Sequence, residues 1–162
     1  MNTTDTQTIA TALKAGPPKE FLESSGYLMK RLGMMMKERS VGALEPSGLT
    51  PYHHAVLALL AEQPRETQGM IADALGFDRS HLVGVLDELE QRGLIERRRD
   101  PEDRRRHLVS LTADGRDALE RMQAVSKEIE AEFLAPLDAE ERATLHRLLR
   151  VLMSAHDPRC PY

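Results

Sequence analysis

Two short amphipathic segments joined by a tight turn constrain the fold of this chain more than any other feature. Thr67 can cap the first segment as a helix, and Gly76 suits the left-handed exit that ends many helices. Asp78 can cap the second helix, and Gly93 can end it. The apolar residues that recur at helical spacing are Met70, Ile71, Leu75, Leu82, Val85, Leu86 and Leu89. Two short helices connected in this way form a helix-turn-helix.

The segment that follows predicts a β-hairpin rich in arginine. Residues 94–99 and 107–111 are strand-like, and the sequence DPEDRRR between them favours a turn. Six arginines occupy the ten positions 97–106 of a chain whose formal net charge is −4. Because salt screens charges over about 8 to 10 Å, this patch can act on a nearby polyanion despite the acidic remainder. A helix-turn-helix followed by such a hairpin is a winged helix.

Longer helices are predicted on both sides of this unit. The first runs from Pro17 to Arg39, and the glycines and proline of Val41–Leu49 indicate a loop. A second helix starts at Thr50-Pro51, and the residues expected on its apolar face are Tyr52, Val56, Leu59 and Leu60. After the hairpin, Thr112 opens a long helix that ends near Pro136. Asp138 and Glu141 have the spacing of a capping box for a last helix.

These elements predict one compact domain of mainly α class with a small β-hairpin. Residues 1–16 are expected to form a flexible tail, and residues 50–112 the winged helix-turn-helix. Residues 17–49 and 113–162 carry apolar stripes longer than a single small lobe can cover. We therefore expect them to be dimerisation helices that bury each other across a twofold axis in a homodimer.

Composition excludes several other classes of protein. No apolar run approaches the roughly 20 residues of a spanning helix, so no membrane association is predicted and the protein is expected to be cytoplasmic. Cys160 is the single cysteine, which rules out an intrachain disulfide and a cysteine metal cage within one chain but leaves a disulfide between two copies open. No cofactor is expected.

The run GLIERRRDPEDRRRHLVSLTADG resembles the wing of the MarR (multiple antibiotic resistance regulator) family of bacterial transcription factors. That family's pattern is Asp-x-Arg, three residues, an aliphatic residue, x, Leu-Thr, two residues and Gly. The matching residues are Asp103, Arg105, Val109, Leu111, Thr112 and Gly115. The resemblance extends over residues 20–155 in element order. It implies a homodimer held by the first and last helices, with a recognition helix in each major groove and a wing arginine in the flanking minor groove.

The wing arginines are therefore the first candidates for contacts with double-stranded DNA. Arg105 lies in the hairpin turn, and its planar guanidinium suits a narrow minor groove of enhanced negative potential. Asp103 could hold that guanidinium in position by a charge-assisted hydrogen bond. The other predicted wing contacts are Arg97, Arg98 and Arg104. The alternative is that these arginines only keep the turn soluble in water, or that they pair with its acidic residues.

On the recognition helix, the predicted contacts lie on the face away from the apolar residues. We expect Arg79, Ser80 and His81 to reach phosphates or base edges from the amino end of the helix, where its dipole favours phosphate. Val83 and Gly84 lie farther along the same outer surface. Gly84 departs from the family pattern, because members often place an arginine in the middle of this helix.

The resemblance also implies regulation by a small molecule. Most members repress transcription, and many release DNA on binding a small aromatic acid or phenol between the first two helices and the fifth. The residues expected to line that pocket are Met29, Arg31, Tyr52, His53 and His54, although packing or exposure to water would explain them equally well. No metal site is expected, because adjacent histidines on a helix point about 100° apart.

The sequence favours DNA binding over two other classes of function. An enzyme is not expected, because the sequence contains no phosphate-binding glycine loop, no GxSxG and no HExxH motif. A winged helix that binds another protein remains the alternative, and the acidic residues between 50 and 92 would suit it. Salt dependence separates these readings, since DNA binding weakens steeply as salt rises. Redox-sensing members keep their cysteine near the amino end, so that mechanism does not carry over to Cys160.

Overall fold

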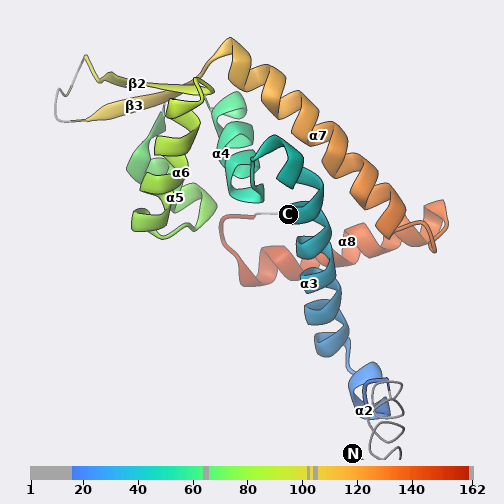
Figure 1. Ribbon diagram of the computed structural model, residues 1–162. Coiled ribbons are helices and arrows are strands. Elements are labelled where there is room, and N and C mark those ends of the chain that lie inside the picture. The colour runs from blue at the N-terminus through green and yellow to red at the C-terminus, as the bar shows by residue number, and fades with distance from the viewer. Residues whose placement is uncertain (1–15, 64–65, 102, 104–105, 161–162) are drawn as a thin grey trace, which may run out of the picture. The chain divides into compact units, whose positions relative to one another are not determined.

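The computed structural model describes residues 16–63, 66–101, 103 and 106–160 (Figure 1). The chain divides into two compact units, Met1–Glu38 and Arg39–Tyr162. The tail predicted over residues 1–16 lies outside the described residues except for Gly16, and Arg104 and Arg105 lie outside them as well.

The first unit contains α2 (Lys19–Leu22) and the start of α3 (Ser25–Leu44). The prediction of one helix from Pro17 to Arg39 was wrong at Glu23–Ser24, because the Ser24 hydroxyl accepts from the Tyr27 N–H at 3.3 Å and starts a new helix. The predicted loop over Val41–Leu49 was wrong only over Val41–Leu44. The helix continues to Leu44, which is buried, and a short 3₁₀ turn, η1 (Glu45–Ser47), follows. Burial of Leu44 in the core outweighs the weak helix propensity of the nearby glycine.

Helix α4 (Pro51–Glu62) begins where the sequence predicts, and its buried face differs from the prediction. The Thr50 hydroxyl accepts from the His53 N–H, and the His53 ring accepts from the Thr50 N–H, which closes a capping box. The buried residues are His53, Val56, Leu57 and Leu60, whereas Tyr52 is 39% exposed and Leu59 is half-buried. Capping by His53 turns this imidazole inward and brings Leu57 into the core in place of Leu59.

The helix-turn-helix is confirmed as α5 (Gln68–Leu75) and α6 (Arg79–Gln91). The Thr67 hydroxyl caps α5 by accepting from the Met70 N–H at 3.3 Å. Gly76 follows α5 with φ of 66°, a left-handed conformation that glycine adopts without strain. The apolar face predicted for α6 is buried: Leu82, Val85, Leu86 and Leu89.

The predicted hairpin is confirmed as β2 (Ile95–Arg99) and β3 (His107–Leu111), and a third strand joins it. Strand β1 (Glu66–Thr67) pairs with β3 and gives an antiparallel sheet of order β1-β3-β2. A strand of two residues has no periodicity for sequence analysis to detect. The β2–β3 hairpin extends past α5 and α6 (Figure 1), and β1 attaches its base to the start of α5.

Two capped helices complete the fold. Thr112 caps α7 (Ala113–Phe133) by accepting from the Gly115 N–H at 3.0 Å. Asp138 and Glu141 form the predicted capping box of α8 (Ala139–His156). The core lies among α4, α5, α6, the sheet and the first half of α7, and its fully buried members include Leu57, Ile71, Leu86, Ile95 and Val109. Within the described ranges, no helix combines the length and apolar character needed to cross a membrane.

Candidate nucleic-acid interface

The amino end of the recognition helix α6 is held by its N-cap. One Asp78 carboxylate oxygen accepts from the Ser80 N–H at 2.9 Å and the His81 N–H at 3.3 Å. The Ser80 hydroxyl donates to the same oxygen. This side-chain hydrogen bond, followed by the two backbone hydrogen bonds, lowers the pKa of Asp78. Three hydrogen bonds to Asp78 thus hold the first turn of α6, and the hydroxyl of Ser80, which was predicted to reach DNA, donates within the cap.

The outer face of α6 carries Ser80, Val83, Gly84 and Asp87, which share the spacing of one helical stripe. Val83 is 40% exposed, and a Cβ placed on Gly84 would meet no atom within 4 Å. Arg79 flanks this stripe with an exposed side chain that lies 3.8 Å from the Asp73 carboxylate. The predicted recognition-helix residues, His81 included, are thus exposed.

His81 lies in a small aromatic cluster. Its ring centroid is 4.6 Å from that of Tyr52 at an interplanar angle of 78°, and 6.2 Å from that of Phe77. Tyr52 and Phe77 also meet edge to face at 5.3 Å. The cluster joins α4, the turn before α6 and the first turn of α6. Tyr52 therefore packs against the first turn of the recognition helix.

Arg97 ties the wing to the recognition helix. Its guanidinium forms an ion pair with Asp87 and lies 3.0 Å from the Glu90 carboxylate, and the side chain is only 20% exposed. Arg97 was predicted to contact DNA, but the structure places it between β2 and α6. The pairing also offsets negative charge on the helix surface, because both carboxylates belong to α6.

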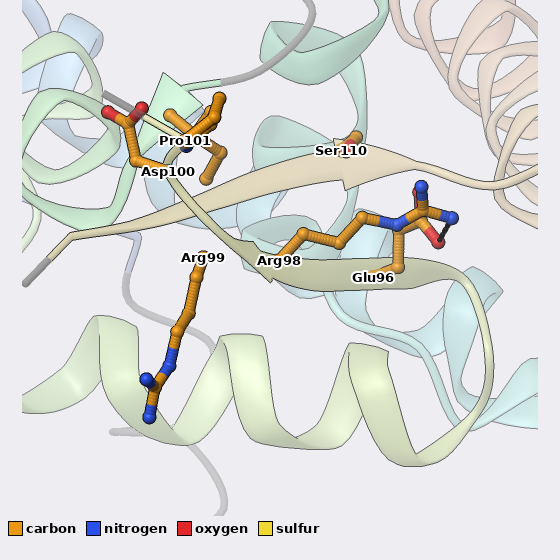
Figure 2. A pocket seen from close by; sticks show the side chains of 7 residues that line it. Glu96, Arg98, Arg99, Asp100, Pro101 and Ser110 are labelled. Carbon is orange, nitrogen blue, oxygen red and sulfur yellow. Dashed lines mark hydrogen bonds and ion pairs between the residues drawn. The ribbon is translucent and has the colours of Figure 1, made fainter. Parts of the chain in front are cut away.

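The exposed arginines of the wing point in different directions. Arg98 is 75% exposed and its guanidinium lies 2.9 Å from the Glu96 carboxylate. Figure 2 shows the Arg99 side chain pointing away from this pair. The residues around them line an open pocket of about 390 Å³: Glu96, Arg98, Arg99, Asp100, Pro101, Leu108 and Ser110. Guanidinium groups therefore project from the hairpin, as the sequence predicts for Arg98.

At the described edge of the hairpin turn, Asp103 contacts Arg106. Its carboxylate lies 3.4 Å from the Arg106 guanidinium, and its carbonyl accepts from the Arg106 N–H at 2.8 Å. The prediction was that Asp103 would hold Arg105. Because Arg105 lies outside the described residues, that prediction is untested.

Two histidines, the buried His53 and the half-buried His54, connect α4 to its neighbours. The His53 Nε2 lies 3.1 Å from the Glu88 carboxylate on α6, and the Ser126 hydroxyl of α7 lies 3.4 Å from the His54 ring. Burial lowers the pKa of both imidazoles, and at His53 it outweighs the attraction of Glu88. Because the Thr50 N–H occupies Nδ1, the neutral His53 ring donates from Nε2 to Glu88. Among the described residues, no group of three His, Cys, Asp or Glu side chains could hold a metal ion.

Two further arginines that the sequence did not single out make contacts beside the helix-turn-helix. Arg92, just after α6, donates to the carbonyl oxygens of Ser47 at 3.1 Å and Gly48 at 2.8 Å. Arg159 forms a bidentate pair with Asp157 and lies so close to Gly76 that a Cβ there would be 1.5 Å from it. Sequence analysis could not detect the contact of Arg92 with Ser47 and Gly48 or the approach of Arg159 to Gly76, because these partners are far apart in the sequence.

A second pocket, of about 420 Å³, lies in the Arg39–Tyr162 unit. Its walls are mainly apolar and include two arginines; the lining residues are Ala43, Leu44, Pro46, Ser47, Leu49, Arg92, Leu94, Ala118, Arg121, Met122 and Val125. The five residues predicted to line an effector pocket are absent from this lining. Met29 and Arg31 are exposed on α3, and the other three take part in the contacts described above.

Comparison with known proteins agrees with this architecture. Residues 49–107 match the MarR family. A protein of Thauera aromatica named as a transcriptional regulatory protein for an hcr operon is 38% identical over 135 residues, which cover 78% of this chain and 81% of the relative. The chain belongs to the MarR family. The family assignment predicted from the wing motif is thereby confirmed, and with it the fold and the class of DNA-binding transcriptional regulator.

Two solved structures that are similar to this chain carry names that mention a small molecule or DNA. BpsR of Bordetella bronchiseptica, whose DNA binding is regulated by 6-hydroxynicotinic acid, is 31% identical with a TM-score of 0.72 and covers 85% of this chain and 97% of its own. The Mycobacterium tuberculosis MarR family protein Rv2887, solved in complex with DNA, is 29% identical with a TM-score of 0.70 and covers 80% of this chain and 97% of its own.

Proposed function

We propose that this MarR-family regulator is a repressor that binds a palindromic operator as a homodimer. The observation that carries the proposal is the capped recognition helix, whose outer face is exposed beside a hairpin bearing the exposed guanidinium of Arg98. The complex of the similar chain Rv2887 with DNA supports DNA binding by this protein.

The proposed dimer rests on apolar residues that face outward in each unit. On α8 the exposed residues are Leu148, Leu149, Val151, Leu152 and Met153. On α2 and α3 they include Phe21, Leu22, Leu28, Met29, Leu32, Met34 and Met35. Helix faces of this kind are stabilised when they are removed from water, and a second copy supplies the matching face. Two recognition helices would then address half-sites about 10 bp apart from centre to centre.

Replacing Arg105 by alanine is expected to weaken operator binding by about 1 to 3 kcal/mol while leaving the fold unchanged. The substitution removes a permanent charge and a planar donor from the turn that can project farthest into the minor groove. Arg105→Lys keeps the charge but loses the planar group, so it should recover only part of the affinity. Fluorescence anisotropy on one operator at two salt concentrations measures both variants.

Two measurements on the parent protein test the proposed function as a whole. Sedimentation of the parent protein at micromolar concentration should give a dimer, and its affinity for the operator should fall steeply with salt. A monomer, a footprint without twofold symmetry or salt-independent binding would contradict the proposal. If Arg105→Ala binds the operator as tightly as the parent, the arginines of the turn do not contact DNA and are simply exposed to water.

We further propose that a small aromatic carboxylic acid releases the operator by binding the 420 Å³ pocket lined by Arg92 and Arg121. The apolar walls suit an aromatic ring, and a guanidinium can bind a carboxylate through two parallel hydrogen bonds. Arg92 already donates to the backbone of Ser47 and Gly48, so Arg121 is the better placed to receive the acid. Regulation of BpsR by 6-hydroxynicotinic acid supports this class of effector.

Arg121→Gln is expected to weaken binding of the acid at least about tenfold, because a hydrogen bond to a charged group contributes about 1.5 to 3 kcal/mol. A panel of hydroxybenzoic and hydroxynicotinic acids, tested by thermal shift and then by titration calorimetry, identifies the ligand. Arg116→Gln, on the same helix but outside the pocket, is the matched control and should bind like the parent. Equal affinity of the Arg121 variant and the parent would exclude this pocket.

A further inference from the structure

The outer face of the recognition helix carries a small exposed apolar spot, formed by Val83 and Gly84, between polar residues. Val83 and Gly84 stand three and four residues after Ser80, which places all three on one face. The Val83 side chain is partly exposed, and the space beside the Gly84 Cα is open for 4 Å. This spot carries no side-chain hydrogen-bond donor or acceptor.

Two of the polar side chains beside the spot already have partners within the protein. The Ser80 hydroxyl donates to Asp78, and the Asp87 carboxylate forms an ion pair with Arg97. The His81 ring packs against Tyr52. Hydrogen-bond reading of bases by this face is therefore restricted, and apolar contact is the interaction that the face offers most directly.

The major groove contains one apolar group, the 5-methyl group of thymine. A helix without a side chain at Gly84 can bring its backbone close to the base edges, and the Val83 methyl groups then stand beside it. The exposed Arg79 guanidinium on the same helix favours approach of the phosphate backbone. We propose that Val83 and Gly84 determine operator specificity by packing against a thymine methyl group in each half-site. This inference rests on the proposed operator binding.

The test removes one methyl group at a time from the DNA. Duplexes with a randomised core are selected on the full-length protein, and the selected duplex is remade with deoxyuridine at each thymine in turn. Uracil lacks only the 5-methyl group. At one thymine in each half-site, the replacement is expected to weaken binding by the parent about fourfold, the effect of losing one buried methyl group.

Variants of the protein assign the effect to its residues. In Val83→Ser and in Gly84→Gln, the thymine and uracil duplexes are expected to bind equally at that position, and circular dichroism verifies the helical content of each variant. Met70→Ala shortens an exposed apolar side chain on α5 and is the matched control, which should discriminate like the parent.

The outcomes separate this inference from the function on which it rests. If the parent selects no duplex over the random pool, operator binding fails and the inference fails with it. If the parent binds the selected duplex and no uracil replacement weakens it, the inference is overturned while operator binding stands. Discrimination that persists in both Val83→Ser and Gly84→Gln would overturn the assignment to this spot.

Discussion

Gly115→Ala is expected to destabilise the fold by about 3 kcal/mol, even though alanine is the better helix former. A Cβ at this position of α7 would lie 2.0 Å from the Leu94 carbonyl oxygen and 2.8 Å from the Leu111 Cδ1. The nearest obstacle is backbone, which cannot turn aside as the end of a long side chain can. Urea unfolding followed by circular dichroism measures the loss as a lower midpoint at unchanged slope.

Gly84→Ala is the matched control for this substitution. Gly84 is also helical, but a Cβ there would meet no atom within 4 Å. Because alanine restricts the unfolded chain more than glycine, this variant should be more stable than the parent by about 0.5 to 1 kcal/mol. Equal stability of the Gly115 and Gly84 variants would contradict the proposed close contact with Leu94.

The contact explains the glycine that closes the wing motif. The Thr112 hydroxyl donates to the Gly93 carbonyl at 2.7 Å and accepts from the Gly115 N–H, while the Thr112 N–H donates to the Leu94 carbonyl at 3.1 Å. The start of α7 is thereby held against the chain that enters β2. The Leu-Thr-x-x-Gly spacing thus positions the base of the wing against α7, the long helix that follows it.

Acidification below pH 6.5 is expected to destabilise the protein through His53 and His54. Burial lowers the pKa of both imidazoles in the folded state, so the unfolded chain binds more protons between each lowered pKa and the ordinary value of 6.5. Stability is therefore fully present above 6.5 and falls as the pH drops through this window. Each imidazole contributes a slope of up to about 1.4 kcal/mol per pH unit, or about 3 kcal/mol per unit together.

Urea unfolding at several pH values between neutrality and pH 5 measures this slope. His54→Gln keeps a hydrogen-bonding side chain beside Ser126 and removes one titrating group, so its slope should be smaller than that of the parent. His53→Gln should lower the slope as well, and should also lower stability at neutral pH because it disturbs the cap of α4 and the contact with Glu88. A slope unchanged in both variants would show that other groups carry the acid sensitivity.

The starts of the helices could be predicted because capping is local. The caps of α4, α5, α6, α7 and α8 are Thr50, Thr67, Asp78, Thr112 and Asp138, and each accepts from a backbone N–H within three residues. The apolar face of α6 was equally predictable, because its apolar residues recur with the helical period of 3.6 residues. The hairpin followed from turn residues between two strand-like segments.

The candidate site was predicted less completely. The wing motif led to the family, and Arg79, Val83, Gly84 and Arg98 are exposed where the sequence placed them. Arg97 was assigned to DNA because a run of arginines does not reveal which member lies beside two carboxylates of a neighbouring helix. The prediction for Arg105 could not be compared, because that residue lies outside the described part of the chain.

The sequence by itself determined where most helices begin, which face of the recognition helix is buried and to which family the chain belongs. Only the tertiary structure decided that His53 is buried against Glu88, that Arg97 supports the recognition helix and that two residues at Glu66–Thr67 complete the sheet. The physical reason is the range of the interactions. Caps and periodic faces depend on neighbours within a turn or two, whereas a buried imidazole, a paired guanidinium or a two-residue strand is stabilised by partners that only folding brings together.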